Sequence, residues 1–450
     1  MSRSYFERTW IAQEVLLSWN ATVIIGTHRF PWRLLRNAAL TTQKCFCLPI
    51  DRESLSYWRL VALAIFVERI WKGVAFTIIE LLQQLHMSRC RDPRDMVYAV
   101  LGMIQYPHGA ISKSQAVATG LPIPDYTKSI EQVYRDTAAA IITSNQDLAL
   151  FFNIQVPRMR NISTMPTWAI DWSPSPEGWW HASNPKIEQV GAIKPLNAFQ
   201  KNSFVRPVPH GTAPIFPATD TMPISVAGRV LTAPGLSLGD VVWTSNPLHV
   251  DGFVFSLVEL QSSVNQRCGN SLVDKYITGE PMIQALCKTI LMGTNDTEAK
   301  GRGYETSGPG GWTPMFESFF GVLVSNDMMK RRNEMEGIPE DLFRLMCIQQ
   351  TGAGLFLSAA KSVGNQRVFQ TGKAGLMGIA ALDVKEGDRV VLLRGAYAPV
   401  VVRRVKAETR KGRSSSWEIF CEAYVHGAMD DEDEVFQDGL CGDWDTYEIM

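Results

Sequence analysis

Two different hydrophobic patterns occupy the two ends of this 450-residue chain. In the first third, apolar side chains recur at helical spacing, most regularly between Ile130 and Ile142, where they follow the i, i+3, i+4, i+7 pattern. From Gln366 to Val425, short β-rich runs are separated by turn residues such as Gly372. Because the helical and β-rich segments are segregated, the sequence predicts an α+β protein.

The first fifty residues combine both patterns. Bulky residues from Tyr5 to Leu17 predict a helix, residues 21–25 and 28–30 predict two strands around a turn, and Pro31 is typical of the start of another helix. Further along, residues 55–85 predict core helices that break near Gly73, because glycine costs about 1 kcal/mol relative to alanine in a helix interior.

Two further helix starts carry capping signals. Asp92 followed by Pro93 and Arg94 predicts a capped start, and either Thr127 or Ser129 is placed to cap the helix over 130–142.

The second half of the chain is predicted to be less regular at first and then β-rich. Apolar residues show no regular spacing between 157 and 223, which predicts irregular structure. Residues 224–232 predict a strand with a bulge at Gly228. Residues 294–313 contain five glycines and predict a loop. Strands at 367–370, 389–393, 399–403 and 417–425 predict a small β-barrel or sheet, and the acidic run from Asp430 predicts a solvated terminus. The sequence therefore predicts five regions. They are residues 1–50, a helical region over 51–175, an irregular or mixed region over 176–345, a β-rich module over 346–430 and an acidic tail over 431–450.

Composition excludes several classes of protein. Hydrophobic residues make up 46% of the chain, which excludes a globally disordered protein, and 44 Lys and Arg against 45 Asp and Glu leave no overall charge to attract nucleic acid or a membrane surface. The start of the chain lacks the pattern of a secretory signal, and no apolar stretch reaches the ~20 residues that cross a bilayer. Eight scattered cysteines favour reduced thiols, so we expect a cytoplasmic protein.

Five runs, taken in their order and spacing, resemble the fungal heterokaryon-incompatibility (HET) family. They are Tyr5–Glu14 (YFERTWIAQE), Arg89–Gly102 (RCRDPRDMVYAVLG), Ile123–Tyr134 (IPDYTKSIEQVY), Pro166–Ser173 (PTWAIDWS) and Glu422–Met429 (EAYVHGAM).

The resemblance implies a fold and a function. Tyr5–Glu14 is similar to the closing segment of a HET domain, so residues 1–50 are expected to be the C-terminal remnant of a TIR-like α/β domain in a chain that is N-terminally truncated relative to the family. The family implies fungal non-self recognition and programmed cell death, and we expect this chain to act in it mainly through protein partners. The alternatives are a TIR-like NAD-consuming enzyme and an inactive truncated paralogue.

Glu14 is the candidate catalytic residue for the enzyme alternative. Trp10 and Glu14 lie four residues apart on one predicted helical face, where the indole could shield the carboxylate from water. TIR domains that cleave NAD use a glutamate in a Trp-Cys-x-x-Glu run, and Ile11 stands here where that run has cysteine. A structural glutamate is the competing interpretation.

Three other candidates have structural interpretations that we favour. The arginines of the cluster around Asp92 could bind a phosphate, but capping and local ion pairing explain them equally well. Asp171 between two tryptophans is expected to fix a turn, and His426 is expected to be structural rather than an acid or base, because no nucleophile stands near it in sequence.

Metal, nucleotide and nucleic-acid sites have little support in the sequence. The seven histidines show no metal-ligand spacing and Cys45-x-Cys47 has no second pair, so no metal and no cofactor is predicted. Walker A, Gly-x-Ser-x-Gly and His-Glu-x-x-His motifs are absent. The basic stretch 403–413 lacks interleaved aromatic residues and is interpreted as solvated charge.

Overall fold

The computed structural model describes most of both ends of the chain and less of the centre. The described residues are 4–18, 20–44, 55–72, 76, 78–85, 88–104, 120–153, 160–173, 223–248, 259–260, 263–264, 275–291, 366–372, 375–396, 398–405, 416–429 and 444–450. The predicted loop at 294–313, Cys45 and Cys47 lie outside them.

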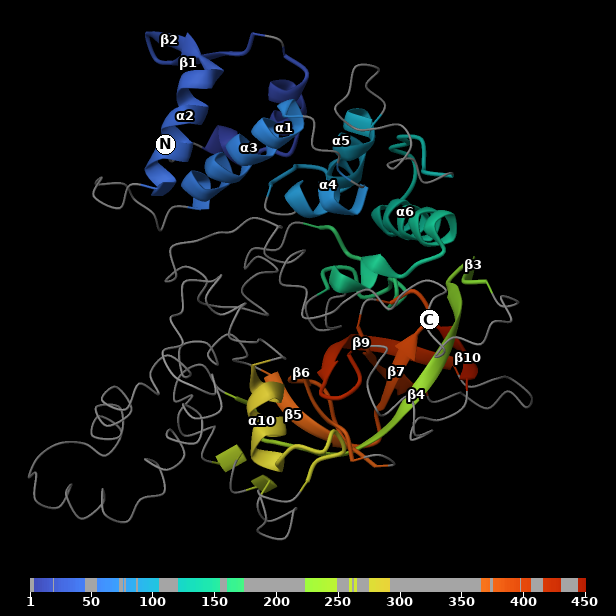
Figure 1. The fold of residues 1–450 in the computed structure, drawn as a ribbon. Helices are drawn as coiled ribbons and strands as arrows, with labels where there is room; N and C mark the ends of the chain where they lie inside the picture. The colour runs from blue at the N-terminus through green and yellow to red at the C-terminus, as the bar shows by residue number, and fades with distance from the viewer. Residues whose placement is uncertain are drawn as a thin grey trace, which may run out of the picture. The chain divides into compact units, whose positions relative to one another are not determined.

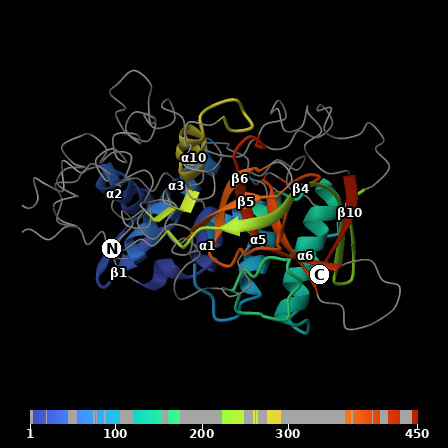
Figure 2. The same cartoon turned by 90° about the horizontal axis from the view of Figure 1, so that it is seen from below.

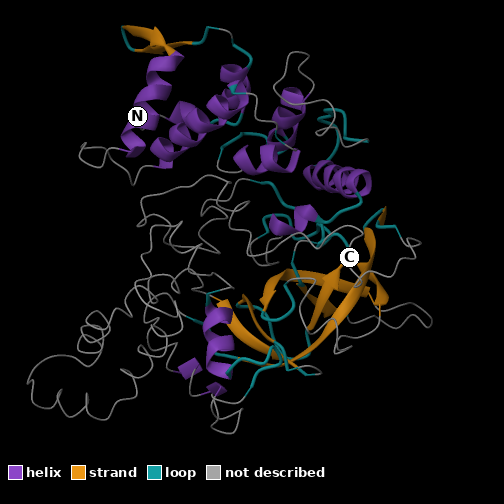
Figure 3. Ribbon diagram, viewed as in Figure 1, coloured by secondary structure: helices purple, strands orange, loops and turns teal. Residues whose placement is uncertain are grey.

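The chain divides into two compact units. The first contains residues 1–179 and 225–229, and the second contains residues 230–450, with the segment between divided among both. Helices dominate the first unit and strands the second (Figure 3). The predicted mixture of helix and sheet is therefore confirmed at this coarse level.

The N-terminal part of the first unit matches the predicted order of elements. A 3-10 turn, η1 (Ser4–Glu7), leads into α1 (Trp10–Leu16), and β1 (Thr22–Ile25) pairs antiparallel with β2 (His28–Pro31) before α2 (Trp32–Lys44). Ile11, Ala12 and Val15 of α1 are buried, which gives the helix the expected apolar face.

Four more helices follow among the described residues of the first unit. They are α3 (Leu55–Trp71), α4 (Ile78–Leu85), α5 (Asp95–Ile104) and α6 (Ile130–Asn145), followed by the 3-10 turn η2 (Ala149–Asn153). As predicted, two helices rather than one occupy this segment, with α3 ending at Trp71 and α4 beginning at Ile78, whereas Gly73 lies outside the described residues. Ser129 caps α6 in a capping box, in which its side chain accepts from the Gln132 N–H while the Gln132 side chain accepts from the Ser129 N–H.

The second unit is built on one sheet in the order β10-β4-β5-β6-β9-β8-β7, with additional β10–β9 and β4–β7 pairings (Figures 1 and 2). Its strands are β4 (Val230–Thr244), β5 (Gln366–Thr371), β6 (Met377–Ala381), β7 (Arg389–Leu393), β8 (Val400–Arg404), β9 (Ser416–Val425) and β10 (Trp444–Ile449), and β3 (Ser225–Ala227) precedes it in the chain. α10 (Met282–Ile290) contacts β6.

Long strand β4 differs most from its prediction. The predicted strand ends at Thr232, but β4 continues through Pro234, Gly235 and Gly239 to Thr244. The register shifts between Ser237 and Gly239, so a bulge accommodates the glycine inside the pairing with β7. Gly228, predicted as a bulge, has a φ of +64° in the turn that precedes β4.

Two strands were not predicted. β6 has the sequence Met-Gly-Ile-Ala-Ala, with one β-branched residue and no polar alternation, and it forms because β5 and β9 pair with it on its two edges. β10 lies in the predicted acidic tail, where Tyr447 and Ile449 are 1% and 0% exposed. Residues 444–449 therefore form a paired strand with two buried side chains rather than a solvated tail, and residues 430–443 lie outside the described part.

The C-terminal sheet is curled but is not a closed barrel. β10 joins β9 through only two residue pairs, Glu448 with Ser416 and Ile449 with Trp417. The prediction of a barrel or sheet is therefore confirmed only as a sheet. Its core includes Phe369, Val390 and Val401, none of which is exposed to solvent. Among the described residues, no helix is both long enough and apolar enough to span a membrane.

Candidate functional site

The first two family-like runs contact each other in the first unit. The N–H of Thr9 donates to the carbonyl of Arg89 at 2.9 Å, and Arg8 and Arg89 form a parallel β-bridge. Next to them α1 packs closely on α5, where a Cβ at Gly102 would lie 2.4 Å from Nε2 of Gln13. These residues therefore dock α1 onto the body of the unit.

Arg94 connects the second run to the third. Its Nε and Nη2 donate to the two carboxylate oxygens of Asp92, and its Nη1 donates to the carbonyls of Tyr126 and Lys128 at 2.6 and 2.8 Å. The pKa of Asp92 is lowered, chiefly by the hydrogen bond from Arg94. Because these contacts occupy four of the five guanidinium N–H groups, Arg94 is committed to the fold rather than to a phosphate.

Asp171 holds the fourth run. It is fully buried, and its carboxylate accepts backbone N–H bonds from Asn161, Ile162 and Ser173 at 2.8 to 3.0 Å. Next to it, the Trp172 ring lies edge-on to Tyr134 of the third run, with ring centroids 5.4 Å apart. The expected turn-fixing role of Asp171 matches this geometry.

Glu14 is on the exposed side of α1. Its carboxylate accepts a hydrogen bond of 3.0 Å from the Tyr5 hydroxyl, and the Tyr5 side chain is itself 46% exposed. Trp10 opens the same helix and is half-buried. The shielded environment expected for a catalytic carboxylate is therefore not present at Glu14, which faces solvent.

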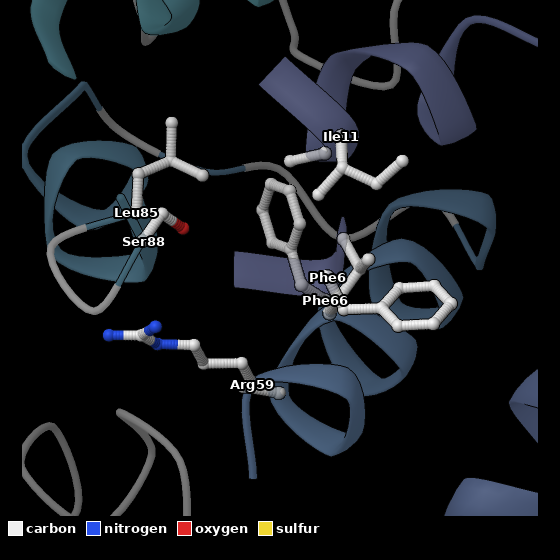
Figure 4. Close-up of a pocket in the computed structure, with 9 residues that line it drawn as sticks. Phe6, Ile11, Arg59, Phe66, Leu85 and Ser88 are labelled. Carbon is white, nitrogen blue, oxygen red and sulfur yellow. The ribbon is translucent and has the colours of Figure 1, made fainter. Parts of the chain in front are cut away.

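A small cavity lies against the buried face of α1 (Figure 4). It has a volume of about 30 Å³, and Glu14 is not part of its lining. Apolar side chains form most of the wall, whereas Arg59 of α3 and Ser88 supply polar groups. Arg59 and Arg89 form ion pairs of 3.0 and 3.2 Å with the buried carboxylate of Glu7.

In the second unit, His426 is part of a buried polar network. Its Nε2 contacts Glu280, which also pairs with Lys288, and its Nδ1 lies 3.1 Å from the Tyr424 hydroxyl. Burial raises the pKa of Glu280, but Lys288 and His426 outweigh burial and hold it below its usual value. Because both ring nitrogens are engaged, the structural interpretation of His426 is favoured over a free acid or base.

The remaining predicted sites give little chemistry. Among the described residues, no group of three or more His, Cys, Asp or Glu is arranged to hold a metal ion. Cys90, Cys287 and Cys421 are free, and burial raises the pKa of Cys90 to about 11, which disfavours a reactive thiolate. Of the basic stretch, Arg403 pairs with Asp388, and residues 406–413 lie outside the described part.

Sequence reasoning did not single out Glu7 or Arg59. Each stands in a segment predicted to be helical, and 52 positions separate them, so spacing gave no signal for their pairing. The only available hint was that charged residues fall within apolar helical stretches, where they need a partner when buried.

No known family model, curated protein or solved structure matches this chain.

Proposed function

We propose that this chain acts in fungal non-self recognition and cell-death signalling, in the cytoplasm, through contacts with protein partners. The proposal rests on the resemblance of its five runs to the HET family, with residues 1–50 as part of a TIR-like α/β domain. Four of those runs contact one another within the first unit. The residues that resemble the family are therefore residues that hold this unit together.

The exposed position of Glu14 is the observation that favours a binding function over a catalytic one. A carboxylate that takes part in bond cleavage is usually held in a pocket that excludes water and orients the substrate. Here Glu14 faces solvent with Tyr5 as its hydrogen-bond partner, and the neighbouring cavity of about 30 Å³ is far smaller than a dinucleotide.

The same unit presents residues suited to a protein interface. Trp71 is 47% exposed at the end of α3, and the Arg36 guanidinium lies 5.6 Å from its ring centroid. Ile24 in the β1–β2 hairpin is 61% exposed. Tryptophan and arginine are enriched among the residues that dominate binding energy at interfaces, so Trp71 is the side chain to test.

NAD cleavage by Glu14 is the second candidate function. It draws on the spacing of Trp10 and Glu14, which the structure keeps on one short helix. The two described strands in this region form an antiparallel hairpin, which by itself provides no crevice of the kind found at the strand ends of a parallel sheet.

Inducible expression in a filamentous fungus distinguishes the two functions. Cell death is scored by vital-dye uptake, and cellular NAD is quantified before death begins. We expect wild-type protein and Glu14→Gln to kill equally without early NAD loss, and Trp71→Ala to kill less.

Glu386→Gln is the matched control, because Glu386 is an exposed carboxylate in the other unit. Early NAD loss that disappears only in Glu14→Gln would establish the enzyme instead. Absence of any death response to the wild-type protein would remove support for a role in incompatibility and favour an inactive paralogue.

A further inference from the structure

The β1–β2 hairpin and helix α2 carry positive charge that the fold does not neutralise. Residues 15–50 contain no acidic residue, although acidic and basic residues balance over the whole chain. The basic residues of this run are Arg29, Arg33, Arg36 and Lys44. Arg29 and Arg33 are exposed and Arg36 is half-buried, and within the described ranges none of these three arginines forms an ion pair.

The neighbouring helix does not supply the missing negative charge. α2 packs against α3 (Figure 1), and the acidic residue of α3, Glu68, pairs with Lys72 at 2.7 Å. Arg36 donates through Nε and Nη2 to the neutral side chain of Asn37, at 3.2 and 2.9 Å. Because a guanidinium has five N–H groups, three of those of Arg36 remain available to an acceptor.

Exposed apolar side chains flank the arginines of α2. Successive residues of a helix are about 100° apart around its axis, so Arg33 lies between Leu34 and Arg36 on the outer side of α2. Leu34 is 54% exposed, and Trp71, whose ring centroid lies 5.6 Å from the Arg36 guanidinium, is 47% exposed. These four residues, Arg33, Leu34, Arg36 and Trp71, define the α2 surface, in which two cations stand between two apolar side chains.

This composition determines the class of partner that fits the α2 surface. Arginine binds carboxylates through two parallel N–H bonds, so an acidic side chain is the matching group. Attachment to an anionic membrane takes a cluster of about four to eight cations, and binding of nucleic acid typically uses about six to ten phosphate contacts. The described part of this region offers three arginines, and its exposed leucine and tryptophan match an apolar side chain of a protein rather than a phosphate backbone.

We propose that the α2 surface binds an acidic segment of a protein partner, whose carboxylates pair with Arg33 and Arg36 while an adjacent apolar side chain packs on Leu34 or Trp71. This rests on the proposed binding function and specifies the chemistry of its partner. Asn37 and Trp71 already hold the Arg36 side chain in place, so little side-chain freedom is lost when a carboxylate binds there.

Two synthetic peptides test the proposal on the full chain. The first has the sequence Glu-Glu-Asp-Glu-Leu-Phe, and the second replaces each acid by its amide, so that the two differ in charge and hardly in shape. Each carries an uncharged dye, and fluorescence anisotropy measures its affinity. We expect the acidic peptide to bind at least about tenfold more tightly than the amide peptide, because a charged acceptor bonds arginine more strongly. Added salt should weaken binding of the acidic peptide, because the pairs form at an exposed surface.

Three variants locate the contact. The double variant Arg33→Gln with Arg36→Gln should weaken binding of the acidic peptide at least about tenfold, and Trp71→Ala should weaken it about threefold or more. Arg91→Gln is the matched control, because Arg91 is also an exposed arginine of the first unit but precedes α5 and is not part of the α2 surface. It should bind the peptide as the wild type does. Circular dichroism establishes that each variant is folded.

Equal affinity for the two peptides would overturn the proposal. An equal loss of binding in Arg91→Gln and in the double variant would overturn it as well, because positive charge would then act without a defined site. Vesicles containing phosphatidylserine are the competing probe, and binding of vesicles in place of the acidic peptide would assign the surface to a membrane instead.

The peptide titration and the cell-death assay fail independently of each other. A chain that kills cells but does not distinguish the two peptides loses only the acidic partner. A chain that binds the acidic peptide but causes no death keeps the α2 surface as a binding site and loses the role in incompatibility.

Discussion

The phenolic hydroxyl of Tyr134 donates a hydrogen bond of 2.6 Å to the backbone carbonyl of Pro93, forty-one residues earlier in the chain. Tyr134 is fully buried in α6, and Pro93 stands just before α5. Burial raises the pKa of Tyr134, so the hydroxyl keeps its proton and donates at any physiological pH. Together with the Arg94 contacts, this hydrogen bond links the second and third family-like runs.

Tyr134→Phe is expected to lower the free energy of unfolding of the first unit by about 1–2 kcal/mol, because the Pro93 carbonyl loses its donor while the packing of the ring is kept. Urea unfolding followed by tryptophan fluorescence measures the change. Tyr5→Phe, which removes the exposed hydrogen bond to Glu14, is the control and should change the value by less than about 0.5 kcal/mol. Equal losses in the two variants would contradict the assignment.

Gly378→Ala is expected to destabilise the second unit by about 2 kcal/mol or more, because a Cβ there would lie 2.3 Å from Cζ of Phe369 and 2.6 Å from the backbone oxygen of Tyr424. Gly102→Ala is the matched comparison. The three atoms nearest to its Cβ would all belong to the end of the flexible Gln13 side chain, which can turn away, and alanine favours the helix by about 1 kcal/mol, so this variant should be nearly neutral. Thermal unfolding of both variants gives the comparison, and a neutral Gly378→Ala would contradict the packing of β6.

Glu422 gives a pH dependence that is the reverse of the usual one for a carboxylate. Burial raises the pKa of this half-buried side chain from 4.5 to about 8. A raised folded-state pKa means that its contribution to stability is complete below pH 4.5 and is lost as the pH rises through about 8.

We therefore expect Glu422→Gln to become more stable than the wild type as the pH rises from about 5 to about 8, by about 1–2 kcal/mol after allowing for partial solvent exposure. Urea unfolding over this pH range measures the difference. Glu418→Gln, which removes a half-buried carboxylate from the same strand, controls for the loss of one charge. A pH-independent difference for Glu422→Gln would show that Glu422 is ionised in the folded protein.

The stability contributed by Glu280 should depend on pH in the opposite direction to that of Glu422, because Lys288 and His426 hold the pKa of Glu280 below 4.5 despite burial. A lowered folded-state pKa means that its contribution is complete above pH 4.5 and is lost as the pH falls through the folded-state value. Relative to Glu280→Gln, the wild type should lose on the order of 1 kcal/mol of stability between about pH 6 and about pH 3. Acid-dependent urea unfolding tests this, and a pH-independent difference would contradict the ion pairs.

Local signals predicted most of the first unit correctly. α6 was found because its apolar period, the Ser129 cap and the Gln132 partner all lie within one segment and favour the same structure. The break between α3 and α4 and the hairpin of β1 and β2 were predictable for the same reason. The structural interpretations of Asp92 and Asp171 also depended on neighbours only a few residues away.

Pairings between distant segments were not predictable from the pattern. β6 and β10 carry weak strand signals and form because β4, β5 and β9 supply their hydrogen-bond partners. In the same way, the sequence shows Arg59 only as a charged residue within an apolar helical stretch. Its contact with Glu7 and its place in the cavity wall arise from the tertiary fold.

The sequence by itself determined the segregation of helix from strand, the Ser129 cap of α6 and the polar residues that fix turns, since each depends on side chains within a few positions of one another. The tertiary structure decided that Glu14 faces solvent, that His426 is enclosed by Glu280 and Tyr424, and that residues 444–449 form a strand paired with β4. Burial and long-range pairing depend on what the rest of the fold places beside a residue, and spacing along the chain does not encode that.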